Sequence, residues 1–364
     1  MAVAEINLHY EYGKIEIGDL MLESGTILPQ AHIAYERVGS IGAPVILVCH
    51  GLTGNQFAYG NDGTSGWWSG MIGPYQWIDT NEYQVITTNV IGGCNGTTGP
   101  LSINPDNKEI YRASFPFVTI RDMVHAQYKA LRKMGIDHVH AVIGGSLGGM
   151  QVLEWGILYP TFMDKLFPLA ATSYLSDYAI AFNAMSRFAI IHDPKWNHGN
   201  YPLEDKPDHG LSLARMLGMI TYRSQELYNQ RFQRSLRNEW GNSHDEITFE
   251  IESYLSYQGD KLTKRFDANS YLYLLKAMDS HDIGRGRGGW KEALKLLKAP
   301  MIAIAYKGDL LYPPESLKEL TEAYRQLGGH ANFYEIDTIY GHDGFLVEFD
   351  KWGSIVKEGL YGID

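Results

Sequence analysis

The order of apolar and polar positions predicts edge strands followed by a regular alternation of strands and helices. Up to about Glu36, apolar and polar residues alternate between turn residues, which predicts antiparallel strands at one edge of a sheet. Continuous apolar runs, typical of buried strands, then alternate with segments of helical spacing. The predicted strands are 43–51, 83–93, 138–145 and 165–172, and the predicted helices are 119–135 and 147–160. This pattern indicates an α/β protein with a mostly parallel central sheet covered by helices on both faces.

The alternation stops after Thr172 and returns near residue 300. Residues 173–295 have the spacing of helices and are rich in tyrosine, arginine and methionine. The chain then continues with a strand, a helix, a second strand and a last helix after Gly344. We therefore predict a core formed by residues 1–172 and 296–364, interrupted by a helical insertion over 173–295. An insertion near the carboxyl ends of parallel strands is placed to form a lid over an active site.

Composition narrows the functional classes. The 364 residues carry a net charge of −11, which argues against a nucleic-acid partner because phosphate-binding surfaces are normally basic. Two cysteines, no visible secretory signal and no apolar run near the ~20 residues of a membrane helix predict a cytoplasmic protein without a membrane partner. The histidines lack His-Glu-x-x-His spacing and the cysteines are far apart, so no metal site is expected.

The stretch AVIGGSLGGM, residues 141–150, places one serine among four glycines directly after a strand-like run. A flexible linker does not follow such a run, and the glycine spacing fits neither phosphate-loop pattern. Gly144, Ser146 and Gly148 match G-x-S-x-G, in which a strand turns sharply into a helix and exposes a strained nucleophilic serine. Side chains at the glycines would clash with the neighbouring strand and helix.

The serine needs a histidine as base and a carboxylate that orients the histidine. In the α/β-hydrolase arrangement the carboxylate follows the serine in the chain, and the histidine follows the carboxylate. Among 13 histidines, His342 follows the last predicted strand in a loop that precedes a helix, where the base is expected. Asp309 ends the strand before that one and is the candidate orienting group, whereas Asp337 comes too late in the order. The alternatives are a structural loop histidine and a turn or N-cap aspartate.

The same arrangement predicts where an oxyanion would be bound. One donor is expected to be the backbone N–H of Leu147, the residue after the nucleophile. The second comes from the loop after the third strand, CHGLTGN, in which Leu52 is the best candidate.

Nine stretches of the chain together resemble one family, the homoserine O-acetyltransferases. They are GLTGN, GWWSGMIGP, NVIGGCNGTTGPLSINP, FPFVTIRDMVHAQ, GGSLGGMQVLEW, ARMLGMITYRS, FEIESYLSYQGDK, FDANSYLYL and YGHDGFL. The resemblance extends from about Tyr35 over nearly the whole chain. Many of the stretches lie in loops and in the insertion, where a generic α/β-hydrolase would not match. The resemblance implies an α/β-hydrolase fold with a helical lid insertion.

The resemblance also implies a reaction and a set of binding residues. The family moves an acetyl group from acetyl-CoA, a co-substrate rather than a bound cofactor, to the γ-hydroxyl of L-homoserine, an early step towards methionine. The expected route has two steps through an acyl-enzyme at Ser146. Arg215 matches the arginine for the substrate carboxylate, Asp343 matches the partner of the amino group, and Tyr222 matches a tyrosine near that site. The resemblance further implies a homodimer formed through the insertion.

Several functions stay open at this stage. Tyr174 and Asn95 depart from the family's frequent residues, and both are expected near the acyl-donor or acceptor pocket. Succinyl-CoA as donor or serine as acceptor are therefore alternatives. A hydrolase with the same triad is another alternative, in which water rather than an alcohol takes the acyl group from the serine. A non-catalytic binding protein on this fold is a further alternative, which the intact triad argues against.

Overall fold

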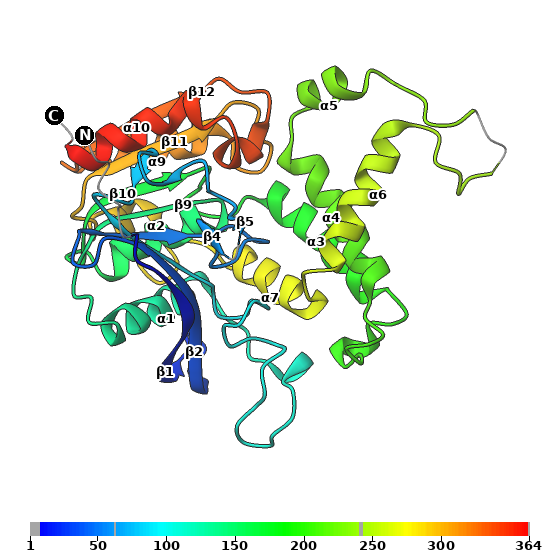
Figure 1. Ribbon diagram of the computed structural model, residues 1–364, viewed down its shortest axis with the longest axis horizontal. Helices are drawn as coiled ribbons and strands as arrows, with labels where there is room; N and C mark the ends of the chain where they lie inside the picture. The colour runs from blue at the N-terminus through cyan, green and yellow to red at the C-terminus, as the bar shows by residue number, and fades with distance from the viewer. Residues whose placement is uncertain (1–7, 62, 240–242, 363–364) are drawn as a thin grey trace.

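The computed structural model describes residues 8–61, 63–239 and 243–362 (Figure 1). Its central sheet has eight strands in the order β1-β2-β8-β3-β9-β10-β11-β12. Their bounds are β1 Tyr10–Met21, β2 Ile27–Gly39, β3 Val45–Cys49, β8 Gln84–Thr88, β9 Val139–Gly145, β10 Met163–Leu169, β11 Met301–Tyr306 and β12 Ala331–Ile336. β1, β2 and β8 pair antiparallel, whereas every pair from β8 to β12 is parallel. The prediction of a mostly parallel sheet with an antiparallel edge is confirmed.

Helices cover both faces of the sheet because the buried strands are apolar on both sides. In β3, Leu47 belongs to the core cluster that also contains residues of α1, α2 and α9, and Ile46 belongs to the cluster that contains residues of α10. The helices of these two layers are α1 Ile120–Lys133, α2 Leu147–Leu158, α9 Pro314–Gln326 and α10 Phe349–Tyr361. The result is a three-layer sandwich, the α/β-hydrolase fold, whose core lies between the sheet and each helix layer.

The segment between β10 and β11 is helical, and Figure 1 shows α3 to α6 beside the sheet rather than on its faces. Its helices are α3 Asp177–Ile191, α4 Asp208–Tyr222, α5 Gln225–Phe232, α6 Glu250–Thr263, α7 Ala268–Asp279 and α8 Trp290–Leu294. Ser176, Ser224 and Asp267 each accept a backbone N–H at a helix start, which is the role expected of N-cap residues. α8 contacts α9, so the last part of the predicted insertion packs on the core. The boundary at residue 295 stays a prediction.

Ion pairs anchor the chain where it returns from the insertion. Arg285 lies 2.8 Å from Glu23 at the β1–β2 turn, and Arg287 lies 2.8 Å from Glu154 of α2. Arg121 of α1 lies 3.1 Å from the same Glu154, whose side chain is almost fully buried. Two guanidinium groups therefore compensate one buried carboxylate, which fixes this linker to the core.

Short elements complete the fold. They are β4 Gly60–Asn61, β5 Thr64–Ser65, β6 Ile72–Gly73, β7 Ile78–Asp79 and the 3₁₀ turns η1 Arg112–Ser114, η2 Asn197–Gly199 and η3 Gly341–Leu346. Within the described ranges, no helix is long and apolar enough to cross a lipid bilayer.

Candidate active site

Ser146 stands at the sharp turn between β9 and α2. Its backbone has φ +61° and ψ −123°, a conformation that non-glycine residues adopt rarely and that marks a strained position. A Cβ atom on Gly148 would lie 2.1 Å from the Cys49 carbonyl oxygen, and one on Gly144 would lie 2.6 Å from the same atom. The glycines let the turn pack directly against the end of β3, as the sequence predicted.

The structure brings Ser146, His342 and Asp309 into one hydrogen-bonded chain. The His342 Nε2 atom lies 2.8 Å from the Ser146 Oγ, and the His342 Nδ1 atom lies 2.7 Å from the Asp309 Oδ2. An ionised carboxylate only accepts hydrogen bonds, so the proton of neutral His342 is on Nδ1 and Nε2 accepts from the serine hydroxyl. All three residues are nearly buried, with exposed fractions of 6%, 3% and 4%. This is the arrangement of an activated serine nucleophile.

The acid and the base are held from different elements. Asp309 lies in the loop after β11, where its Oδ1 accepts the backbone N–H groups of Leu311 and Tyr312, both at 2.9 Å. This leaves Oδ2 free to face the imidazole. His342 lies in the 3₁₀ turn η3 rather than in an irregular loop. Burial lowers the pKa of His342, but Asp309 and Asp343 outweigh burial and raise it above its ordinary value.

The two backbone N–H groups predicted to bind an oxyanion belong to Leu52 and Leu147. Leu147 is the first residue of α2, so its N–H has no acceptor within the helix and benefits from the helix dipole. Leu52 lies in the turn after β3 and lines the same cavity as Ser146. Among the described residues no protein group accepts a hydrogen bond from either N–H. Both groups are therefore available to an external acceptor.

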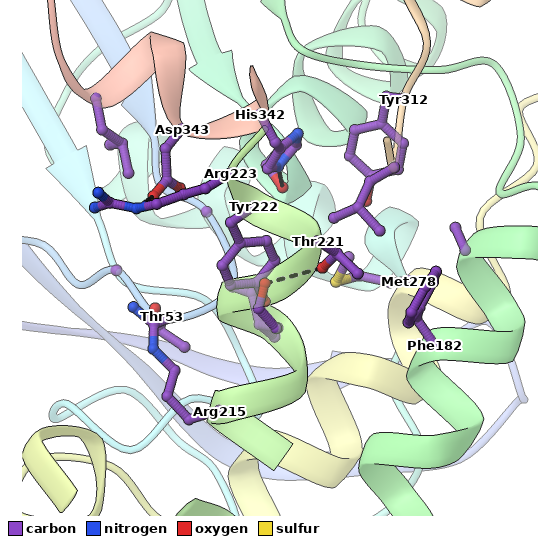
Figure 2. A pocket seen from close by; sticks show the side chains of 18 of the residues that line it. Thr53, Phe182, Arg215, Thr221, Tyr222, Arg223, Met278, Tyr312, His342 and Asp343 are labelled. Atoms are coloured by element: carbon purple, nitrogen blue, oxygen red, sulfur yellow. Dashed lines mark hydrogen bonds and ion pairs between the residues drawn. The ribbon is translucent and has the colours of Figure 1, made fainter. Parts of the chain in front are cut away.

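A cavity of about 270 Å³ lies above the serine, between the core and the helices of the insertion (Figure 2). Arg215 and Tyr222 of α4 reach into it, and the Arg215 guanidinium lies 5.4 Å from the centre of the Tyr222 ring. The Tyr222 ring in turn lies 5.9 Å from the His342 ring. Among the described residues, no carboxylate lies within ion-pair distance of Arg215. Arg215 is therefore a free cation close to the candidate nucleophile.

Asp343, next to His342, forms an ion pair that sequence reasoning missed. Its Oδ2 accepts from Arg223 Nε at 3.2 Å, and both side chains line the cavity. Burial raises the pKa of Asp343, against the opposite effects of Arg223, Arg215 and His342. Arg223 directly follows Tyr222 in the sequence, and this adjacency was the only available signal for its place in the cavity.

A third arginine joins the insertion to the candidate oxyanion loop. The Arg265 Nη1 donates to the Thr53 carbonyl oxygen at 2.8 Å, next to Leu52 in the chain. Burial, and then the charge of the nearby Arg215, lower the pKa of Arg265. With one carboxylate, Asp343, and three arginines at its wall, the cavity is suited to an anionic ligand.

Two other residues singled out in the sequence are not among those that line this cavity. They are Tyr174 and Asn95, although Leu175, next to Tyr174, does line it. The expectation that they border the donor or acceptor pocket stays a prediction. Tyr174 forms a β-bridge with Asp282, and Asn95 donates to the Cys94 Sγ. Within the part of the chain that the structure describes, no three His, Cys, Asp or Glu side chains are grouped as metal ligands.

Comparison with known proteins agrees with this geometry. The family described as alpha/beta hydrolase fold matches residues 44–349. A homoserine O-acetyltransferase of Carboxydothermus hydrogenoformans is 46% identical over 359 residues, which are 96% of this chain and 95% of that protein. The crystal structure of homoserine O-acetyltransferase from Bacillus anthracis has a TM-score of 0.90 and 30% identity, covering 97% and 98% of the two chains. Esterase E22 also reaches 0.90, at 26% identity, covering 97% and 100%. The chain belongs to the homoserine O-acetyltransferase family, within the α/β-hydrolase fold.

Proposed function

We propose that this protein transfers an acetyl group from acetyl-CoA to the γ-hydroxyl of L-homoserine through an acetyl ester on Ser146. The observation that carries the proposal is the Ser146–His342–Asp309 chain on the floor of a cavity that also holds an unpaired arginine. A serine with its base supports acyl transfer, and a free cation nearby supports an acceptor with a carboxylate.

In the first half-reaction, His342 Nε2 removes the proton of Ser146 as Oγ attacks the thioester carbon. The N–H groups of Leu52 and Leu147 would hold the resulting oxyanion. When the tetrahedral intermediate collapses, the carbon–sulfur bond breaks and His342 returns its proton to the leaving thiolate. Asp309 keeps the imidazole oriented and stabilises its charged form.

In the second half-reaction, homoserine takes the place of CoA. Arg215 pairs with its carboxylate, and Asp343 pairs with its ammonium group beside Arg223. Tyr222 lies under Arg215 and beside His342, so its ring supports the guanidinium at the acceptor position. His342 then removes the γ-hydroxyl proton, the oxygen attacks the acetyl ester, and Ser146 is released.

Thiol release tests the donor and the acceptor together. Purified protein is mixed with acetyl-CoA or succinyl-CoA, each with no acceptor, with L-homoserine or with L-serine, and a thiol-reactive dye reports free CoA. We expect sustained release only with acetyl-CoA plus homoserine. A preference for succinyl-CoA or serine would retain the mechanism and change the substrate.

Acetyl-ester hydrolysis is the second candidate function. Its support is the likeness to esterase E22, whose fold matches over almost the whole chain. In that case water would resolve the acyl-enzyme, and thiol release from acetyl-CoA would continue at the same rate without homoserine.

The partner that we propose for the insertion is a second copy of this chain. The family resemblance supports a homodimer, and α3 exposes an apolar stripe in which Tyr178, Met185 and Phe188 are each more than half exposed. Light scattering should report a dimer, and Met185→Asp together with Phe188→Asp should give a folded monomer. A wild-type monomer at micromolar concentration would contradict this proposal.

A further inference from the structure

Tyr312 lies beside the catalytic chain without a role in the mechanism above. It follows β11 in the loop of Asp309, and its backbone N–H donates to the Asp309 Oδ1 at 2.9 Å. Its ring meets the His342 ring edge to face, with 5.0 Å between the ring centres. Figure 2 shows the two side chains next to each other at the cavity. Tyr312 is thus fixed against both the acid and the base.

The hydroxyl group of Tyr312 is an unpaired polar atom in this buried place. The residue is 2% exposed, and its hydroxyl has no hydrogen-bond partner of standard geometry among the described residues. The Ser146 hydroxyl is nevertheless within hydrogen-bonding range of it, and the charge of Asp309 also acts on it. Buried hydroxyl groups are nearly always paired, so this one calls for a better aligned partner than the resting site provides.

The hydroxyl is also kept in its neutral form. Burial is the main cause that raises the pKa of Tyr312 well above its ordinary value, and the charge of Asp309 acts in the same direction. A neutral phenol can donate one hydrogen bond.

We propose that Tyr312 is a further catalytic residue, whose hydroxyl donates a hydrogen bond to the Ser146 Oγ while that oxygen carries developing negative charge. Charge develops there when Oγ attacks the acyl donor and again when Oγ leaves in the second half-reaction. The resting contact between the Tyr312 and Ser146 hydroxyl groups lacks standard hydrogen-bond geometry. A bond that becomes well aligned only as charge develops on Oγ strengthens the transition state more than the ground state and raises kcat rather than binding. The inference rests on the proposed role of Ser146 as nucleophile, and not on which donor or acceptor is used.

Tyr312→Phe removes the hydroxyl and keeps the ring against His342. Tyr306→Phe is a matched control, because Tyr306 is also fully buried with an unpaired hydroxyl but packs on Trp352 and does not line the cavity. Neither substitution removes a hydrogen bond of standard geometry, so we expect the thermal midpoints of both variants to stay close to that of the wild type.

The test is stopped-flow acylation with p-nitrophenyl acetate and with acetyl-CoA. We expect Tyr312→Phe to acylate roughly 10- to 100-fold more slowly with both donors, somewhat less than the loss caused by removing an oxyanion-hole donor, with KM nearly unchanged. Tyr306→Phe should keep the wild-type rate.

Three results would overturn the inference. They are a wild-type acylation rate in Tyr312→Phe, an effect confined to KM for homoserine, and equal losses in the two variants. If the wild type itself formed no acyl-enzyme with either donor, the nucleophile assignment would fail, and this inference with it. The wild-type burst therefore separates failure of the proposed function from failure of the role given to Tyr312.

Discussion

Replacing Arg215 by methionine removes the one arginine of the cavity that has neither an acidic nor a backbone partner among the described residues, and it keeps most of the side-chain volume. The guanidinium is half-buried over Tyr222, and no described carboxylate forms an ion pair with it. The acceptor's carboxylate would therefore be its first acidic partner. Two opposite charges about 4 Å apart interact by about 4 kcal/mol at an effective dielectric constant of about 20.

Desolvation on binding offsets part of this attraction, which leaves a net loss of about 2–4 kcal/mol in the variant. This loss corresponds to a roughly 30- to 1,000-fold fall in kcat/KM for homoserine. Acylation by acetyl-CoA, which does not use the acceptor site, should change by less than about threefold. The two effects differ enough to be separated in one experiment.

The assay measures the half-reactions separately by stopped flow, first acylation by acetyl-CoA and then discharge of the acyl-enzyme by homoserine. Arg231→Met is the control, because Arg231 of the largely exposed helix α5 stacks on Tyr254 of α6, and its loss changes the net charge by the same amount. An equal loss in both half-reactions would refute the reasoning, since Arg215 would then serve the donor site or the fold.

Three further predictions address the acid, the base and the nucleophile turn. Because Asp309 and Asp343 raise the pKa of His342, and catalysis needs its neutral form, kcat/KM for acetyl-CoA should fall with decreasing pH through a midpoint above about 6.5, and Asp343→Asn should move that midpoint down. A pH profile that Asp343→Asn leaves in place would contradict this. Asp309→Asn should lower kcat roughly 10³- to 10⁴-fold with little change in the circular dichroism spectrum, because its amide would favour the wrong imidazole tautomer. Gly148→Ala should lower the free energy of unfolding by about 1–3 kcal/mol in urea titration, whereas Gly13→Ala, whose Cβ would lie 3.7 Å from Tyr35, should be tolerated.

Much of the fold and the triad could be predicted because their signals are local and periodic. Continuous apolar runs marked the parallel strands, and strand order then selected His342 and Asp309 from many histidines and acids. The two-residue strands β4 to β7 were not predicted, because so short a pairing has no period in the sequence. Their formation depends on the surrounding fold.

The remaining site residues depend on contacts between distant parts of the chain. Arg223 and Asp343 are 120 positions apart, and only the packing of α4 on η3 brings them together. The Tyr312 side chain has no motif of its own, so its approach to His342 needed the structure. Conversely, Tyr174 and Asn95 were conspicuous in the sequence and yet are not among the residues that line the cavity.

The central claim is an acetyl group on Ser146 that homoserine removes. Intact-protein mass spectrometry after mixing with acetyl-CoA alone, followed by peptide mapping, measures it directly. We predict one acetyl group per chain on Ser146, absent in Ser146→Ala, and its rapid loss with formation of O-acetylhomoserine when homoserine is added. An adduct on another residue, or an adduct lost equally fast to water, would contradict the account.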